Sequence, residues 1–286
     1  MAMTFKKILF PTDFSANADR ALEHAVHLAD PADAELIVQH VVSDYFERHS
    51  HWATLFDIHE LQKRMDGYVV SRVLPAFAKN PAVRVRQVIS KGKPAEEISA
   101  LAEKELVDVV VMGSAKGVVT NDVIRRTLRP VFATSMKGGS HPLEVKRILV
   151  ATDFSEHSKK VVRYAFDLKK AFNATLYLLY VVETPRALEF GVRQGAFFQT
   201  IEKMRKWAND QLVNLTPDEY VNDATVIRIV DEGGASDRIA DVAGELGADL
   251  TIVGTHGYEG LRRHFLGGTT DDLLTKIDSP LLAVKL

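Results

Sequence analysis

The sequence contains no cysteine, which excludes disulfide bonds and thiolate chemistry. It also lacks an apolar run long enough for a membrane-spanning helix, and its formal net charge of -2 creates no strong field of either sign. We therefore expect neither nucleic acids nor membranes as partners, since a strongly basic surface usually binds them. The amino-terminal apolar stretch reaches Pro11 too early for the core of a signal peptide, so we expect a cytoplasmic protein.

The chain repeats itself. Lys6–Ser15 returns as Lys146–Ser155 at an offset of 140 residues, and Val107–Ser114 returns as Ala248–Thr255 at an offset of 141. Hydrophobic residues make up 46% of the 286 positions, which is enough apolar material for two packed domains. We predict two homologous domains, residues 1–140 and 141–286, joined by the stretch that contains Gly138 and Gly139.

Within each repeat, short apolar runs alternate with helical patterns. In the first repeat the runs are 8–10, 36–42, 83–89, 107–112 and 131–134, with helical segments such as 19–28 and 96–105 between them. This order predicts an α/β fold: two tandem, open, doubly wound, five-stranded parallel sheets with helices on both faces. The alternation Val83-Arg84-Val85-Arg86 is typical of an edge strand.

The stretch from Leu250 to Thr270 combines an apolar strand, a glycine loop and the start of a helix. The strand ends at Gly254, and further glycines follow at 257, 260, 267 and 268. Glycine lets a ligand approach the backbone, and the free N–H groups of a helix's first turn attract anions. Ligands of doubly wound sheets bind beyond the carboxyl ends of the strands, and phosphate binding is the chemistry that suits such a site. Taken by itself, the pattern fits a phosphate site and a plain structural turn equally well.

These residues resemble the universal stress protein family in its tandem two-domain form. The resemblance covers essentially the whole chain, with Pro-Thr-Asp-Phe-Ser and Ala-Thr-Asp-Phe-Ser at the first strands and Gly-Thr-His-Gly at 254–257. The family's nucleotide signature is Gly, two residues, Gly, nine residues, then Gly followed by Ser or Thr. Gly254, Gly257 and Gly267 match it, but Gly268 stands where a hydroxyl is usual, and Thr269 follows one position later.

The resemblance implies a universal stress protein-like, adenine-nucleotide alpha hydrolase-like fold, with ATP and Mg²⁺ or Mn²⁺ in the second domain. Asp153 would face the adenine and ribose, although the residues alone also allow a helix cap there. Val181 would line the base pocket. The complete set of expected ATP-binding residues is Ala151, Thr152, Asp153, Val181, Val253, Gly254, His256, Gly257, Gly267, Gly268, Thr269 and Thr270.

The first domain has lost the phosphate loop. Pro130 matches Pro280 at an offset of 150, whereas Gly113 matches Gly254 at 141, so nine residues are missing between these points. Lys116 also replaces the glycine at 257, and one ammonium is a poor substitute for an array of oriented N–H groups. We therefore predict one ATP per chain, bound by the second domain.

No motif in the sequence indicates a reaction, because it contains no P-loop, nucleophile elbow or His-Glu-x-x-His pattern. The leading hypothesis is a stress-response or signalling protein, not an enzyme, whose ATP occupancy sets its shape or its unknown protein partner. One alternative is a slow ATP hydrolase. Another is a nucleotide-independent adaptor that binds a lipid, metal or protein through the N-terminal domain, where His49, His51 and His59 form either a metal site or a polar lid.

The last strand of each repeat is a short apolar run, 131–133 in the first and 281–284 in the second. An exposed apolar edge strand invites pairing with another edge. We therefore expect the two domains to pack as a pseudo-dimer through these strands, and a further homodimer stays open.

Overall fold

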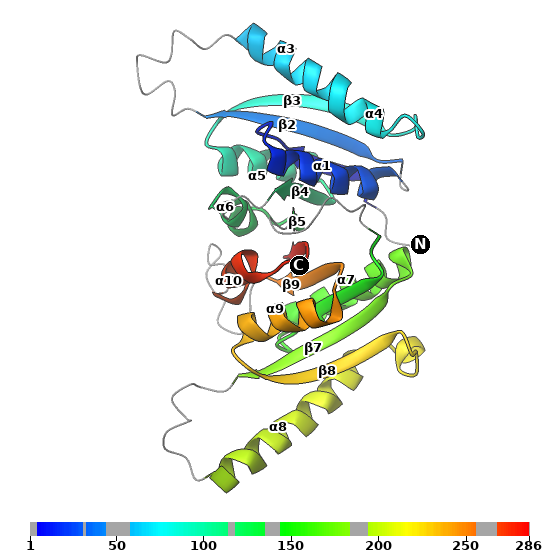
Figure 1. Ribbon diagram of the computed structural model, residues 1–286, viewed down its shortest axis with the longest axis vertical. Coiled ribbons are helices and arrows are strands. Elements are labelled where there is room, and N and C mark those ends of the chain that lie inside the picture. The colour runs from blue at the N-terminus through cyan, green and yellow to red at the C-terminus, as the bar shows by residue number, and fades with distance from the viewer. Residues whose placement is uncertain are drawn as a thin grey trace. The chain divides into compact units, whose positions relative to one another are not determined.

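The computed structural model describes residues 5–30, 33–43, 58–113, 118–134, 144–183, 194–255 and 268–285 (Figure 1). The chain divides into two compact units, an N-terminal unit of Thr4–Leu143 and a C-terminal unit that contains Glu144–Leu286. The predicted domain boundary between residues 140 and 141 lies outside the described residues. None of the described helices is long and apolar enough to cross a membrane.

The N-terminal unit is built on a five-stranded parallel sheet with the order β3-β2-β1-β4-β5. Its strands are β1 (Lys7–Pro11), β2 (Glu35–Ser43), β3 (Arg84–Gly92), β4 (Val109–Gly113) and β5 (Val131–Thr134). Its helices are α1 (Ala16–Ala29), α3 (Ile58–Tyr68), the π-helix η3 (Val69–Val73), α4 (Leu74–Ala76), α5 (Pro94–Glu105) and α6 (Val118–Arg126).

The C-terminal unit has the same architecture, with the strand order β8-β7-β6-β9-β10 and parallel pairing throughout. Its strands are β6 (Arg147–Ala151), β7 (Thr175–Glu183), β8 (Val226–Gly233), β9 (Leu250–Gly254) and β10 (Leu281–Val284). Its helices are α7 (Glu156–Phe172), α8 (Gln194–Leu215), the short 3-10 helix η5 (Asp218–Tyr220), α9 (Ala235–Leu246) and α10 (Gly268–Lys276).

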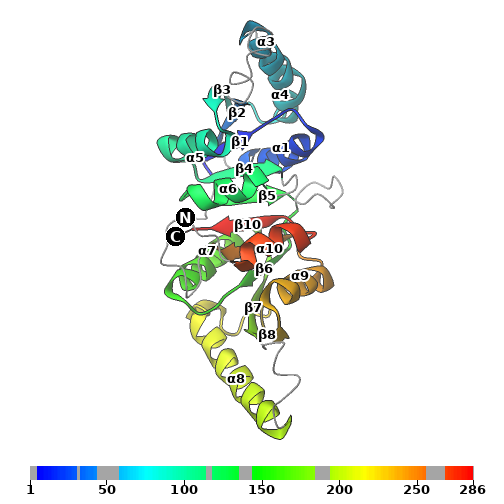
Figure 2. The same ribbon diagram turned by 90° about the vertical axis from the view of Figure 1, so that its left-hand side faces the viewer.

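Helices cover both faces of each sheet, as the predicted doubly wound fold requires. Leu179 and Val181 of β7 pack into an apolar cluster with Ile239 of α9 and Leu273 of α10. Side chains alternate along a strand, so Tyr180 faces the other side, where its ring lies 6.1 Å from that of Trp207 on α8. Figure 2 shows α7 and α8 on one side of the C-terminal strands and α9 on the other.

The strands at the centre of each sheet are more deeply buried than the strand at its outer edge, which is β3 in the N-terminal unit and β8 in the C-terminal unit. In β1 every residue except Lys7 is buried and in β4 every residue except Gly113, whereas no residue of β3 is fully buried. The Val83-Arg84-Val85-Arg86 pattern therefore predicted the edge position of β3 correctly. Pairing between the two domains through their last strands stays a prediction.

Candidate functional site

A tight turn leads from β6 into α7, and its own side chains hold it. Thr152 Oγ1 accepts a hydrogen bond from the N–H of Phe154 at 3.1 Å, and Asp153 Oδ1 accepts from the N–H of Ser155 at 3.0 Å. Ser155 is the N-cap of α7, where its Oγ accepts from the N–H of Ser158 at 3.1 Å. The turn keeps Phe154 at φ 62°, a conformation that is rare for an aromatic residue.

The N-terminal unit makes the same turn between β1 and α1. Thr12 Oγ1 accepts from the N–H of Phe14, and Asp13 Oδ1 accepts from the N–H of Ser15, both at 3.0 Å. Phe14 has a φ of 63°. Because the unit that lacks the glycine loop builds an identical turn, the repeated Thr-Asp-Phe-Ser motif serves the fold in both units, and the motif alone does not mark a nucleotide site.

Asp153 lies at the carboxyl end of β6, partly exposed, and Ser155 occupies the capping position in its place. Burial alone would raise the pKa of the Asp153 carboxyl, but hydrogen bonds from Ser155 and Ser158 outweigh burial and hold this pKa below its ordinary value. The carboxylate is therefore ionised at neutral pH. It can accept hydrogen bonds from ligand hydroxyl or amino groups beside the end of the strand.

The chain order reverses at β6, which makes the β6–β9 junction the switch point of the C-terminal sheet. Pairing of β6 with β9 extends only to Val150 and Ile252, and pairing of β6 with β7 ends at Ala151 and Leu179. The longer strand β7 continues to Glu183. Four residues of β7 therefore extend past β6 at the carboxyl edge.

This overhang leaves main-chain groups near Val181 available to a ligand. The carbonyl of Leu179 faces β6, because it accepts from the N–H of Thr152 at 3.0 Å. Alternate residues of a strand direct their polar groups to the same side, so the N–H and C=O of Val181 also face β6. No described β6 residue pairs with Val181 in that register. Its main chain can bind the edge of a flat polar ring.

A threonine fixes the start of the helix after the fourth strand in both units. Thr270 Oγ1 donates to the carbonyl of Gly254 at 3.1 Å, and Thr120 Oγ1 donates to the carbonyl of Gly113 at the same distance. The partners are sixteen positions apart in the first pair and seven positions apart in the second. The nine-residue difference inferred from the sequence is therefore confirmed as extra chain between two equivalent anchors. Thr270 is 2% exposed, so its hydroxyl has a structural role.

The two helix starts differ in the side chains that they present. In α10 the first residues are Gly268 and Thr269, and no described atom lies within 4 Å of the place where a Cβ of Gly268 would stand. The equivalent residues of α6 are Val118 and Val119, which are 71% and 39% exposed. α6 therefore begins with two branched apolar side chains, whereas α10 begins with a glycine and a threonine. The N–H groups of a helix's first turn attract anions, and a glycine lets a ligand approach them closely.

The structure places the expected ATP-binding residues in three groups. Ala151, Thr152, Asp153 and Val181 lie at the carboxyl ends of β6 and β7, and Val253 and Gly254 end β9. Gly268, Thr269 and Thr270 begin α10. His256, Gly257 and Gly267 lie outside the described residues. Val253 is 4% exposed and belongs to the apolar cluster beneath α9, so its side chain supports the sheet.

A cluster of three aromatic rings borders the turn in the C-terminal unit. Phe154 stacks on Tyr180 with 4.5 Å between ring centroids, and Trp207 of α8 meets Phe154 edge-on at 5.2 Å. Trp207 is 48% exposed although the ring it contacts is buried. Its indole is half-exposed and contacts the residue next to Asp153, so its fluorescence can respond to a ligand that binds there.

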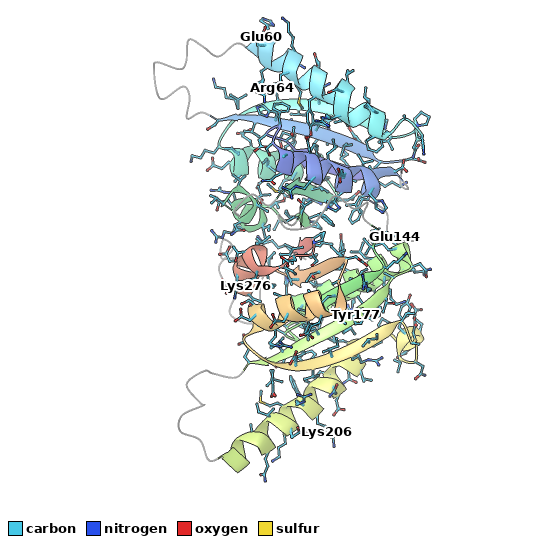
Figure 3. All side chains as sticks on the ribbon, in the orientation of Figure 1. Glu60, Arg64, Glu144, Tyr177, Lys206 and Lys276 are labelled. Atoms are coloured by element: carbon cyan, nitrogen blue, oxygen red, sulfur yellow. The ribbon has the colours of Figure 1, made fainter. Side chains whose placement is uncertain are left out.

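The equivalent cluster of the N-terminal unit has a different composition. Phe14 stacks on His40 with 4.6 Å between centroids and meets Tyr68 edge-on at 5.2 Å. The guanidinium of Arg64, labelled on α3 in Figure 3, lies 4.6 Å from the centroid of Phe14. Burial raises the pKa of Tyr68 well above its ordinary value, and the hydrogen bond to Asp19 acts in the same direction.

Only one of the three histidines considered as metal ligands is among the described residues. His49 and His51 lie outside the described residues, whereas His59 is in α3. Within the described ranges, no group of three or more His, Asp or Glu side chains is arranged to hold a metal ion.

No motif in the sequence indicated an ion pair that the structure forms at the carboxyl end of β8. Asp231 is bound by Arg238 of α9, with 3.0 Å between Nε and Oδ2. Aligning the repeats at the offset of 141 offers one signal. Asp231 aligns with Ser90 and Arg238 with Glu97, so both members of the pair differ between the repeats.

Comparison with known proteins is consistent with both the repeat and the fold. The model of the universal stress protein family matches the chain twice, at residues 4–135 and 144–285. A universal stress protein of Methanocaldococcus jannaschii is 30% identical over 160 residues, which cover 48% of this chain and 99% of that protein. Universal stress protein A homolog 1 of Coxiella burnetii is 30% identical over 146 residues, covering 50% of this chain and 97% of its own length.

The whole chain also resembles solved structures. The crystal structure of a universal stress protein from Archaeoglobus fulgidus covers 98% of this chain and 96% of its own, with a TM-score of 0.65 and 20% identity. A Pseudomonas aeruginosa structure described as a putative universal stress protein covers 98% and 93%, with a TM-score of 0.60 and 19% identity. At this identity the likeness shows the fold alone. The two family matches show more: the chain belongs to the universal stress protein family, with two such domains in tandem.

Proposed function

We propose that this protein is a nucleotide-dependent regulator of the stress response that binds one ATP, in its C-terminal unit. The observation that carries the proposal is the start of α10. There the first helical residue, Gly268, carries no side chain, and thirteen residues separate the helix from Gly254. In the N-terminal unit only four residues separate Gly113 from α6, and that helix begins with the branched side chain of Val118.

The proposed roles of the residues come from the family resemblance and, for the described residues, also from their place at the strand ends and the helix start. The main chain of Gly254, Gly257, Gly267 and Gly268 would bind the phosphates together with the hydroxyl of Thr269, while Thr270 anchors the helix. Asp153 would accept from the ribose, and the main chain of Val181 would bind the base. Ala151 and Thr152 shape the turn, and His256 would lie beside the phosphates.

Mg²⁺ or Mn²⁺ would accompany the phosphates. The first turn of α10 carries the hydroxyl of Thr269 and the carboxylate of Asp271, and such hard oxygen donors suit these ions. The ion would neutralise part of the phosphate charge. Most of its ligands would come from the nucleotide and water, since Mg²⁺ usually keeps several waters.

A titration with ATP and Mg²⁺ tests both the site and its stoichiometry. We expect one ATP per chain by calorimetry, and we expect Gly268→Val, which copies Val118, to weaken binding at least about tenfold. Gly244→Val is the matched control, because Gly244 of α9 also has no described atom within 4 Å of its Cβ position but lies far along its helix. Two equivalent sites, or unchanged affinity in Gly268→Val, would contradict the proposal.

We further propose that bound ATP, and not its hydrolysis, controls whether a protein partner in the cytoplasm binds this protein. Steady-state phosphate release measured with the same protein separates this role from that of a slow ATP hydrolase. Release that matches the rate of nucleotide-dependent changes in partner binding would favour the hydrolase.

A further inference from the structure

A buried glutamine interrupts the apolar core of the N-terminal unit. Gln39 of β2 is 0% exposed, and its side-chain nitrogen donates to Ser90 Oγ at 2.9 Å and to the carbonyl of Glu97 at 3.3 Å. The Glu97 carbonyl can only accept, so the carboxamide must turn its nitrogen toward this group. The oxygen Oε1 then faces away from Glu97, and no described residue donates a hydrogen bond to it.

A second polar group of this kind lies in the helix that contacts Gln39. Ser99 of α5 is 7% exposed, and its hydroxyl oxygen forms no hydrogen bond with any described residue. Buried polar groups are nearly always hydrogen-bonded, because a group without a partner loses its bonds to water and gains none. Gln39 Oε1 therefore calls for a donor that the described residues do not supply.

The C-terminal unit shows that the fold itself needs no polar group at these positions. Gln39 aligns with Leu179 at the offset of 140, and Ser99 aligns with Ala240 at the offset of 141. Leu179 is 0% exposed and belongs to an apolar cluster against which Ala240 packs. The sheet and the helix above it are thus joined by apolar contacts in one unit, whereas the same layer contains a carboxamide and a hydroxyl in the other.

We infer that the N-terminal unit binds an internal water molecule between β2 and α5, and that this water donates a hydrogen bond to Gln39 Oε1. Water is small enough to be enclosed between a strand and a helix, and fixing it costs less than leaving a buried oxygen without a donor. The polar groups identified in this layer are a carboxamide, two hydroxyls and a main-chain carbonyl. All are neutral, which favours a neutral ligand over an ion.

This water would complete a link among three elements. Gln39 joins β2 to β3 through Ser90 and to α5 through Glu97. A hydrogen bond at Oε1 fixes the carboxamide on its remaining side, so the edge strand β3 is held by a side chain as well as by main-chain pairing. The water lies in the unit to which no nucleotide is assigned, so its presence is independent of the proposed function.

A crystal structure of the full chain, at a resolution that shows ordered water, tests the inference. We expect a water oxygen about 2.7–3.2 Å from Gln39 Oε1 in the wild-type protein. Gln39→Leu copies the C-terminal unit and should therefore fold, and we expect it to lose this water. Gln39→Met, which keeps an unbranched side chain without the amide, should lose the water as well.

Gln87→Leu is the matched control. Gln87 is a glutamine of the neighbouring strand, but it is opposite Val38 in the register, so its side chain is on the other face of the sheet from that of Gln39. This variant should keep the water. A wild-type structure without water at Oε1, or with a protein group that donates to it, would overturn the inference. So would a water that stays in place in Gln39→Leu or disappears in Gln87→Leu.

Discussion

Gly113 and Gly254 end equivalent strands, yet the structure predicts opposite outcomes when each is replaced by alanine. A Cβ on Gly113 would stand 2.7 Å from the backbone oxygen of Asn17 in α1. A Cβ on Gly254 would stand 3.3 Å from the ring edge of His157, a side chain that can move. Neither glycine has a positive φ, so alanine itself is allowed at both positions. The difference is therefore one of packing alone.

The two effects can be estimated separately. Replacing glycine by alanine stabilises by about 0.4–1 kcal/mol through the unfolded state, and overpacking a well-packed site costs about 1–3 kcal/mol. Gly113→Ala meets immovable backbone and should lose about 1–2 kcal/mol, which for a unit of this size lowers Tm by roughly 3–8 °C. Gly254→Ala should stay within about 1 kcal/mol of the wild-type stability.

Differential scanning calorimetry of the full chain, with urea unfolding as a second measurement, checks this pair. Both variants should give the same secondary structure by circular dichroism. Equal losses of stability in the two variants would show that the contact with Asn17 does not restrict β4, and the reasoning would then fail.

Three further predictions concern separate parts of the molecule. Asp249→Ala should lower the free energy of unfolding in urea by about 1–2 kcal/mol, because the carboxylate accepts from the N–H groups of Lys146 and Arg147 at 3.0 and 2.8 Å. An unchanged free energy of unfolding would refute its role in holding the start of β6. Hydrogen bonds from Thr225, with the contact to Lys169, lower the pKa of Asp223 to about 2, so its stabilising contribution is present above about pH 4 and is lost as the pH falls toward 2. Asp223→Asn should therefore flatten the fall in stability between pH 4 and 2, and an unchanged slope would contradict this. ATP should change the emission of Trp207, and Trp207→Phe should abolish the change while affinity stays within about threefold; a signal that survives in this variant would have to come from Trp52.

Much of the fold could be predicted because burial and repetition leave clear marks on the sequence. The apolar runs predicted the strands, the alternating arginines predicted the edge position of β3, and two offsets predicted the nine extra residues before α10. The end of β3 was missed. The strand continues to Gly92 through Ser90 and Lys91, because pairing with β2 and not burial keeps this polar stretch extended.

Features that depend on contacts between distant residues could not be predicted. The resemblance implies a phosphate contact for Thr270, whereas its hydroxyl donates to the carbonyl of Gly254, a bond that no local pattern indicates. The π-helix η3 was also not anticipated. It ends at Val73, two residues before Pro75, which lacks an N–H for an ordinary helical bond, and a wider turn accommodates this loss.

Because a threonine fixes the helix start to the end of the fourth strand in both units, the loop between them can be exchanged without altering the surrounding fold. Four residues in one unit and thirteen in the other connect the same strand end to the same helix start. Loop-closure entropy makes the longer connection only about 1 kcal/mol more costly, so the fold tolerates either length. Moving residues 255–267 into the place of 114–117 should therefore leave the N-terminal unit folded. Nucleotide binding would need one more change, Val118→Gly, because the helix start as well as the loop decides whether an anion can reach the amides.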